Sequence, residues 1–234
     1  MPRTITILLA GDVMTGRGID QALEHPGDPT LHEPEVRDAR HYVSLAEAAH
    51  GSFPRPISPA HLWGDALAEL SHVRPAMRIV NLETSITVSD EWCRDKEVHY
   101  RMHPDNIGCL AAAGIDVATV ANNHSLDWGR AGFLDTLASL RCAGIRHAGG
   151  GASCEDARQP AWRCRGDLGV LVFAEVEADG GRLIGLRMVP TQMRRFGLRR
   201  AGRPDAEWLA ATLSRTSRRF GCAVKAGRHG LVVR

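Results

Sequence analysis

The amino-acid sequence predicts an α/β fold. Short apolar runs alternate with segments of helical periodicity over roughly the first 150 residues, and three of those runs end at polar residues. This alternation is typical of a mainly parallel sheet covered by helices. From Leu168 the pattern changes to a hairpin followed by a helix and a short strand. We therefore expect one continuous domain over 1–234, with an α/β half at 1–155 and a hairpin, helix and strand at 166–234.

The first strand is predicted at Thr4–Ala10, an apolar run with β-branched residues that leads into Gly11-Asp12. Residues 24–60 are rich in His, Pro, Gly and Asp and predict a long excursion with one or two helical turns near Leu45–His50. Apolar residues at helical spacing between 62 and 70 then predict a helix.

The second strand is predicted at Arg78–Leu82, and Glu83 follows it directly. Pro104 favours the first turn of a helix over Asn106–Ala113, which Gly114 ends. The next apolar run, Asp116–Ala121, predicts the third strand.

A helix over Arg130–Cys142, ended by Gly144, leads to a fourth strand at Ile145–Ala148. In the C-terminal part, Leu168–Glu177 and 182–189 flank Asp179-Gly180-Gly181, which predicts a β-hairpin. The remaining predicted elements are a helix over 205–219 and a strand over 231–233.

The composition gives no electrostatic reason to expect nucleic acid or an anionic membrane as partner, because 27 acidic residues nearly balance 29 basic ones. One local cluster, Arg194-Arg195 with Arg199-Arg200, is interpreted as a solvated strand edge, the alternative being a nucleic-acid patch.

No apolar run reaches membrane-spanning length and no secretory signal is visible at Met1, so we expect a cytoplasmic location. The six cysteines show no C-x-x-C spacing and are expected to be reduced.

Polar residues follow three predicted strands: Asp12 after the first, Glu83 after the second and Asn122-Asn123-His124 after the third. The carboxyl ends of parallel strands line the ligand crevice of α/β proteins. Carboxylates, amides and one imidazole suit Mn²⁺, Mg²⁺, Fe²⁺ or Zn²⁺ at a hydrolytic centre, and two carboxylates held close without a cation would repel. Each segment also has a simpler interpretation: a helix cap for Asp12, a solvated side chain for Glu83, and a turn for 122–124.

Four motifs at these positions resemble those of the CapA family, bacterial proteins linked to capsule and poly-γ-glutamate biosynthesis. The order, spacing and strand context of the motifs agree with the family over residues 4–155. CapA proteins are in turn similar to calcineurin-like metallophosphoesterases, which build a two-metal centre on a β-sandwich flanked by helices. The motifs are Gly11-Asp12-Val13-Met14 with Gly16-Arg17-Gly18, Asn81-Leu82-Glu83-Thr84, Tyr100-Arg101-Met102-His103-Pro104 with Asn106, and Ala121-Asn122-Asn123-His124-Ser125-Leu126-Asp127 with Gly129.

The resemblance implies a role for each of several residues. Asp12, Glu83 and Asn123 would be metal ligands, and His124 would act beside the metal as a proton donor or oxyanion stabiliser. Lys96 and Arg101 would clamp an anionic group of the substrate, with surface charges on a loop as the alternative interpretation. Met14 stands where related phosphoesterases carry a histidine ligand.

The sequence departs from the family pattern after the fourth motif. The family continues with a histidine-bearing strand end and a Gly-His-x-x-His-like cluster, whereas here 151–165 leads at once to Arg165-Gly166-Asp167-Leu168, which resembles the far end of the family domain. Beyond the fourth motif the only histidines are His147 and His229. A central block with the late histidine motifs therefore looks missing.

We accordingly expect a metallophosphatase-like β-sandwich flanked by helices and truncated internally. The expected function is that of a CapA-type protein derived from a metal-dependent hydrolase of phosphoester or γ-glutamyl polymer substrates. Its cofactor would be a weakly bound divalent metal, Mn, Mg, Fe or Zn. The alternative is a non-catalytic remnant that binds an anionic ligand or a partner. Strand edges and apolar surface left by the missing block predict a homodimer or aggregation rather than a stable monomer.

Overall fold

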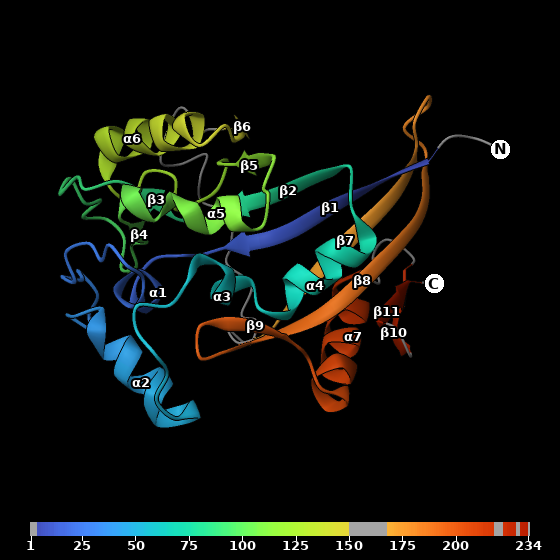
Figure 1. Ribbon diagram of the computed structural model, residues 1–234, viewed down its shortest axis with the longest axis horizontal. Coiled ribbons are helices and arrows are strands. Elements are labelled where there is room, and N and C mark those ends of the chain that lie inside the picture. The colour runs from blue at the N-terminus through green and yellow to red at the C-terminus, as the bar shows by residue number, and fades with distance from the viewer. Residues whose placement is uncertain (1–3, 150–167, 218–221, 228–229, 234) are drawn as a thin grey trace. The chain divides into compact units, whose positions relative to one another are not determined.

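The computed structural model describes residues 4–149, 168–217, 222–227 and 230–233. The described residues contain a large mixed β-sheet and seven α-helices (Figure 1), so the predicted α/β class is confirmed. The finer assignment to a metallophosphatase-like sandwich stays a prediction, as does the division at 155 and 166.

Contacts divide the chain into two compact units that interleave along the sequence. The first unit comprises Met1–Gly11, Trp63–Arg78 and Arg163–Arg234, and the second comprises Asp12–Leu62 and Ile79–Trp162.

The strands of the first unit are antiparallel. Strand β1 (Thr4–Val13), whose last two residues belong to the second unit, pairs with β7 (Leu168–Glu177), and β7 pairs with β8 (Leu183–Arg194). The hairpin of β7 and β8 is the one predicted from the Gly-rich turn (Figure 1). The sequence did not predict two further strands. Strand β9 (Gly197–Arg200) pairs with β8, and β10 (Val224–Gly227) pairs with β11 (Gly230–Val233).

Helices α4 (Asp65–Val73) and α7 (Arg203–Ser217) complete the first unit. Helix α7 packs against β8, β10 and β11 (Figure 1). Buried apolar side chains form the core of this part of the unit. The residues of this core are Met188, Leu209, Ala210, Val224 and Leu231. The arginine cluster lies on the β8–β9 hairpin, where Arg199 and Arg200 form ion pairs with Asp65 and Glu69 of α4. This placement agrees with the strand-edge interpretation.

The strands of the second unit are parallel, as the alternating pattern predicted. Strand β2 (Met77–Leu82) pairs with β5 (Val117–Thr119), and β5 pairs with β6 (Arg146–Ala148). A separate two-stranded sheet joins β3 (Ser85–Ile86) to β4 (Arg101–Met102). The polar ends of β2 and β5 consequently lie at the same end of the parallel strands.

The helices of the second unit surround these strands. Helix α6 (Gly129–Cys142) packs against β3 and β6 (Figure 1). Its Leu140 side chain is fully buried. The single helix predicted over 62–70 is divided at Gly64, whose φ is 46°, into α3 (Pro59–Trp63) and α4. No helix in the described ranges is both long and apolar enough to cross a membrane. The helices are α1 (Gly18–Ala22), α2 (Arg40–His50), α3 (Pro59–Trp63), the 3₁₀ helix η1 (Pro104–Ile107), α5 (Gly108–Ala112) and α6 (Gly129–Cys142).

The described cysteines form no disulfide with one another. Burial raises the pKa of the Cys109 thiol to about 12, so this side chain behaves as a small apolar group at neutral pH. The cysteines concerned are Cys93, Cys109, Cys142 and Cys222.

Candidate functional site

The ends of β1 and β2 bring the predicted carboxylates together in the second unit. The side-chain amide of Asn81 donates a 2.6 Å hydrogen bond to Asp12 Oδ1. The backbone N–H of Glu83 donates a 3.0 Å hydrogen bond to the Val13 carbonyl. Asp12 is exposed, whereas the Glu83 side chain is only 19 % exposed. The expectation that Asp12 and Glu83 lie at one edge of the sheet is therefore confirmed.

A network of side-chain amides ties the segment after β5 to β2. Asn81 Oδ1 accepts hydrogen bonds of 3.1 Å from both the Thr119 hydroxyl and the Asn122 amide. The same Asn122 amide donates to the Leu82 carbonyl at 2.8 Å. Asn122 Oδ1 in turn accepts from the backbone N–H of His124 at 2.9 Å, the arrangement of an Asx turn. Asn122 is thus both a turn residue and the link that places His124 beside the strand ends.

His124 is buried and oriented by a carboxylate that the sequence did not single out. Its Nδ1 lies 2.7 Å from Oδ2 of Asp127, which is fully buried. An ionised carboxylate only accepts, so Nδ1 must carry the hydrogen of this bond. The other ring nitrogen, Nε2, lies 3.7 Å from Oε1 of Glu83. The nitrogen that faces the predicted metal ligands is therefore the one left available for proton transfer.

The surroundings of Glu83 disfavour its ionised form. Burial raises the pKa of Glu83 above its ordinary value, and the negative charge of Asp12 raises it further. The charges of His124 and Lys96 act in the opposite direction, and burial dominates. A bound cation would relieve this repulsion, which is a physical reason for the pair to attract one.

The two cations predicted to clamp substrate have different surroundings. Lys96 Nζ lies within the site, donating to the Asn123 carbonyl at 2.6 Å and to Asp127. Arg101 belongs to β4, and its guanidinium lies 3.8 Å from the centroid of the Trp128 ring. It also donates to the Ser89 carbonyl at 2.9 Å, and its side chain is 9 % exposed. The structure brings Lys96 to His124, while a substrate role for either residue stays a prediction.

The Tyr100 ring, to which the sequence analysis assigned no role, covers one face of His124. The Tyr100 ring stacks on the imidazole, with centroids 4.0 Å apart and an interplanar angle of 24°. The Arg17 guanidinium lies 4.9 Å from the Tyr100 centroid and pairs with Glu33 at 2.6 Å. Arg17 has a φ of 52°, a conformation that non-glycine residues rarely adopt.

The role of Asp127 could have been predicted from its i+3 spacing to His124. No local feature of the sequence predicts that Tyr100 stacks on His124.

The chemistry of the predicted donor set is that of a site for a hard cation, and cation binding there stays a prediction. Asp12 and Glu83 supply carboxylates and Asn123 an amide, which are oxygen ligands of the kind that hard cations accept. No group of three or more His, Cys, Asp and Glu side chains within the described ranges is arranged to hold a metal ion. The two histidines after the fourth motif add no ligand among the described residues. His147 is exposed on β6, and His229 lies outside the described residues, as does the segment 151–165. Water would have to complete the shell.

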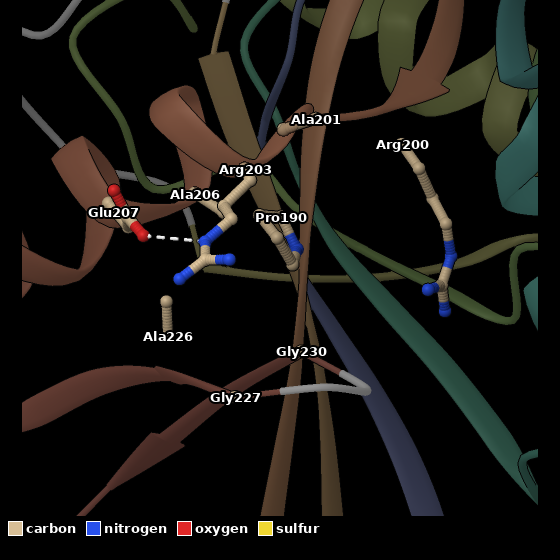
Figure 2. A pocket seen from close by; sticks show the side chains of 9 residues that line it. All are labelled: Pro190, Arg200, Ala201, Arg203, Ala206, Glu207, Ala226, Gly227 and Gly230. Atoms are coloured by element: carbon tan, nitrogen blue, oxygen red, sulfur yellow. Dashed lines mark hydrogen bonds and ion pairs between the residues drawn. The ribbon is translucent and has the colours of Figure 1, made fainter.

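The first unit contains an open pocket of about 590 Å³ between the start of α7 and the β10–β11 hairpin (Figure 2). Its walls are mainly small residues, including Pro190, Ala226 and Gly230. Figure 2 shows the Arg203 side chain directed at Glu207, to which it donates a 2.9 Å hydrogen bond. None of the predicted site residues lines this pocket.

Comparisons with known proteins agree with the motifs. Probable polyglutamine synthesis accessory proteins from two strains of Mycobacterium tuberculosis are 48 % identical over 178 residues, covering 76 % of this chain and 47 % of theirs. The capsule biosynthesis protein CapA of Bacillus anthracis is 21 % identical over 66 % of this chain and 30 % of its own length. The PGA biosynthesis protein CapA of Bacillus subtilis is 25 % identical over 64 % of this chain and 31 % of its own.

The chain therefore spans about half the length of the mycobacterial relatives and under a third of the Bacillus ones. The family profile described as "Bacterial capsule synthesis protein PGA_cap" matches residues 6–198, a range that contains all four motifs and every residue predicted for the site. This chain belongs to the PGA_cap (CapA) family of bacterial capsule synthesis proteins.

Proposed function

We propose that this chain is an accessory protein of capsule or poly-γ-glutamate synthesis. Its strand-end site would descend from a metal-dependent hydrolase of phosphoester or γ-glutamyl polymer substrates, on a metallophosphatase-like sandwich truncated internally. One observation carries the hydrolase ancestry: His124 has Nδ1 fixed by Asp127 and Nε2 3.7 Å from Glu83, at the edge where Asp12 also lies. The names of the relatives support the role in polymer synthesis.

The residues of the site would act as follows. Asp12, Glu83 and Asn123 would hold one divalent cation, Mn²⁺ or Mg²⁺ in preference to tightly held Zn²⁺ or Fe²⁺, because the ligands are oxygens. When bound, such a cation polarises a phosphoryl or carbonyl oxygen. His124 would give a proton from Nε2 to the oxygen or nitrogen that leaves, and Asp127 would keep the imidazole in the orientation and tautomer this requires.

The same donor set argues for weak binding and low turnover. Catalysis with two metals stabilises both the attacking and the leaving oxygen, whereas one ion with few protein ligands stabilises only one of them. Affinity falls when water replaces protein ligands and their supporting hydrogen bonds. We therefore propose a site that retains cation binding with little hydrolytic activity.

A non-catalytic remnant that binds an anion or a partner protein is the second candidate. The observation that favours it is the absence, within the described ranges, of a group of three His, Cys, Asp or Glu side chains arranged around a metal. A remnant of this kind would keep the crevice between the strand ends while having lost the cation.

Manganese binding distinguishes the two candidates. Electron paramagnetic resonance of Mn²⁺ titrated into metal-free protein measures the free ion directly. We expect one Mn²⁺ per chain with a dissociation constant weaker than about 10⁻⁵ M, and loss of binding in Asp12→Ala and Glu83→Ala. Asp90→Ala is the control, because Asp90 is an exposed carboxylate that pairs with Arg101. Wild-type protein that binds no Mn²⁺ would favour the non-catalytic remnant.

A further inference from the structure

We infer that Lys96 is a positioning residue for His124 and does not serve as the cation that binds the substrate. The inference rests on the proposed function, in which His124 moves the proton. It assigns Lys96 a task that neither the motifs nor the relatives indicate, and it replaces the clamp role that the sequence predicts.

The contacts of the Lys96 ammonium carry this inference. Nζ donates to Asp127, to the Asn123 carbonyl at 2.6 Å, and lies 3.2 Å from Nδ1 of His124. Both acceptors belong to the segment 122–127 that carries His124. The side chain is 24 % exposed, so most of it is covered by protein. Two of the three N–H donors are engaged and the positive charge is paired with Asp127, so the attraction that remains for a substrate anion is weak.

The approach of Lys96 to His124 is not itself a hydrogen bond. Nδ1 uses its hydrogen toward Asp127 Oδ2, 2.7 Å away, so Lys96 and His124 are two donors that share one carboxylate. Asp127 Oδ2 accepts a further bond from the backbone N–H of Tyr100 at 2.7 Å. Asp127 thus receives Lys96 on one oxygen and His124 with Tyr100 on the other.

This division of the carboxylate explains how Lys96 acts on His124. Asp127 is 0 % exposed, and a buried charge needs both a counter-charge and hydrogen bonds to keep its place. Lys96 provides the counter-charge on Oδ1, which leaves Oδ2 to hold the imidazole. Without Lys96, Oδ1 would be a buried oxygen without its counter-charge. We expect the carboxylate then to shift toward solvent, which would weaken its hold on the imidazole and on the tautomer of His124. Lys96 therefore acts through Asp127.

Chemical labelling of lysine tests whether the ammonium is engaged. The chain has only two lysines, and Lys225 is exposed on β10, so it is an internal reference. Metal-free protein is treated with acetic anhydride for increasing times, and acetylation at each lysine is measured by mass spectrometry. We expect Lys96 to react on the order of tenfold more slowly than Lys225, because its charge-assisted hydrogen bonds must break first. Equal rates would overturn the inference.

The imidazole resonances of His124 test whether Lys96 positions that ring. The ¹⁵N spectrum of labelled, metal-free protein should show a slowly exchanging Nδ1 proton, assigned by its disappearance in His124→Gln. We expect this proton to be lost from the spectrum in Lys96→Met, to persist in Lys96→Arg, and to be unchanged in Lys225→Met. A Lys96→Met variant that is folded and retains the wild-type resonance would overturn the inference, because Lys96 would then contribute only stability.

These two measurements are independent of the proposed function. Both use protein without metal or substrate, so they give the same result whether or not Mn²⁺ binds. Loss of Mn²⁺ binding with a protected Lys96 would refute the proposed cation site and leave the Lys96–Asp127–His124 arrangement intact. Normal Mn²⁺ binding with a freely reactive Lys96 would refute the positioning role alone.

Discussion

Asn81 and Asp12 are joined by a 2.6 Å hydrogen bond from the side-chain amide to the carboxylate, which links the end of β2 to the end of β1. Replacing Asn81 with Asp removes the donor and places a second negative charge against Asp12. We expect Asn81→Asp to lower the free energy of unfolding by about 1–3 kcal/mol. The double variant Asp12→Asn with Asn81→Asp restores a donor and an acceptor and should recover most of that loss. Urea unfolding of all four proteins measures the coupling, and strictly additive effects would contradict the bond's importance.

The buried carboxylate of Asp20 leads us to expect that the stability of the fold depends on pH. Asp20 accepts hydrogen bonds from the backbone of His103 at 2.9 Å, from Gly27 at 2.8 Å and from the Asn106 amide at 2.8 Å. Burial nevertheless raises the pKa of Asp20 above its ordinary value of 3.8, because it outweighs the lowering effect of these bonds. An acid whose pKa is higher in the folded protein binds its proton more tightly there. Its contribution to stability therefore grows as the pH falls through the raised pKa, and levels off below 3.8.

Asp20→Asn tests this linkage. Asparagine cannot accept all three bonds, so the variant should unfold about 1–3 kcal/mol more easily at pH 7. The deficit should widen as the pH is lowered from 7 toward 4, since only the wild type gains stability there. Urea unfolding at several pH values provides the comparison, with Asp105→Asn at an exposed position as control. A deficit that narrows over this range would show that the hydrogen bonds, and not burial, dominate the pKa of Asp20.

An apolar strip on the first unit predicts self-association. On one face of the sheet, Ile5 and Leu9 of β1 stand opposite Val176 and Val172 of β7, and Leu183 of β8 stands opposite Val176. The side chains of Ile5, Leu9 and Leu183 are 37 %, 40 % and 56 % exposed. These positions carry no charge, so two copies of the strip could pack face to face across a twofold axis without repulsion.

The predicted occupant of this strip is therefore a second copy of the chain. Light scattering should give an average mass above the 25.5 kDa of the monomer, increasing with concentration. Leu9→Gln with Leu183→Gln should bring the mass back toward the monomer. The control is Leu134→Gln, a leucine of α6 that is 51 % exposed. Wild-type protein that stays monomeric over a wide concentration range would contradict the prediction.

The close approach of Gly64 to β9 predicts a strong effect of a single methyl group. Gly64 has a φ of 46°, and a Cβ there would lie 2.0 Å from the Leu198 carbonyl oxygen. Gly144 also has a positive φ, 72°, but a Cβ there would meet no described atom within 4 Å. Gly144→Ala should therefore cost about 1–2 kcal/mol of backbone strain, and Gly64→Ala several kcal/mol more because β9 must move. Thermal unfolding of both variants checks this, and equal losses would mean that β9 adapts freely.

The sequence predicted the parallel strands of the second unit because their apolar runs are short and end at polar residues. It also predicted that Asp12 and Glu83 would meet, since the carboxyl ends of such strands share one edge. The sequence did not predict β9 and β10. Each pairs with its neighbour in the chain, β9 with β8 and β10 with β11, and two residues separate the strands of each pair. Those residues, Arg195-Phe196 and Arg228-His229, include none of the Asn, Asp or Gly that marks a two-residue hairpin in a sequence.

The roles within the site were harder to predict. The neighbourhood of Lys96 in the sequence suggests a surface loop, and only the fold shows that its ammonium reaches Asp127. The same holds for Tyr100, which stacks on His124 although it belongs to a different motif. Residue types and spacing thus indicated which residues gather at the strand ends. Which of them orient others depends on distances that arise from tertiary packing.

The last prediction concerns metal-dependent activity. With Mn²⁺ or Mg²⁺ present, we expect little or no hydrolysis of bis(p-nitrophenyl) phosphate, because one loosely bound ion does not stabilise both the attacking and the leaving oxygen. Any activity should vanish in Asp12→Ala and Glu83→Ala. It should fall about 10²–10⁴-fold in His124→Ala and in Asp127→Asn, since proton transfer requires both the imidazole and its orientation.

Two outcomes of this assay would overturn parts of the proposed site. Robust turnover with two metal ions per chain would mean that His147, His229 or a second subunit supplies the ligands that the late motifs provide in the family. Turnover untouched by Asp12→Ala would be more damaging. Asp12 is the carboxylate whose charge helps to raise the pKa of Glu83, and a reaction indifferent to it would have to take place away from the strand ends.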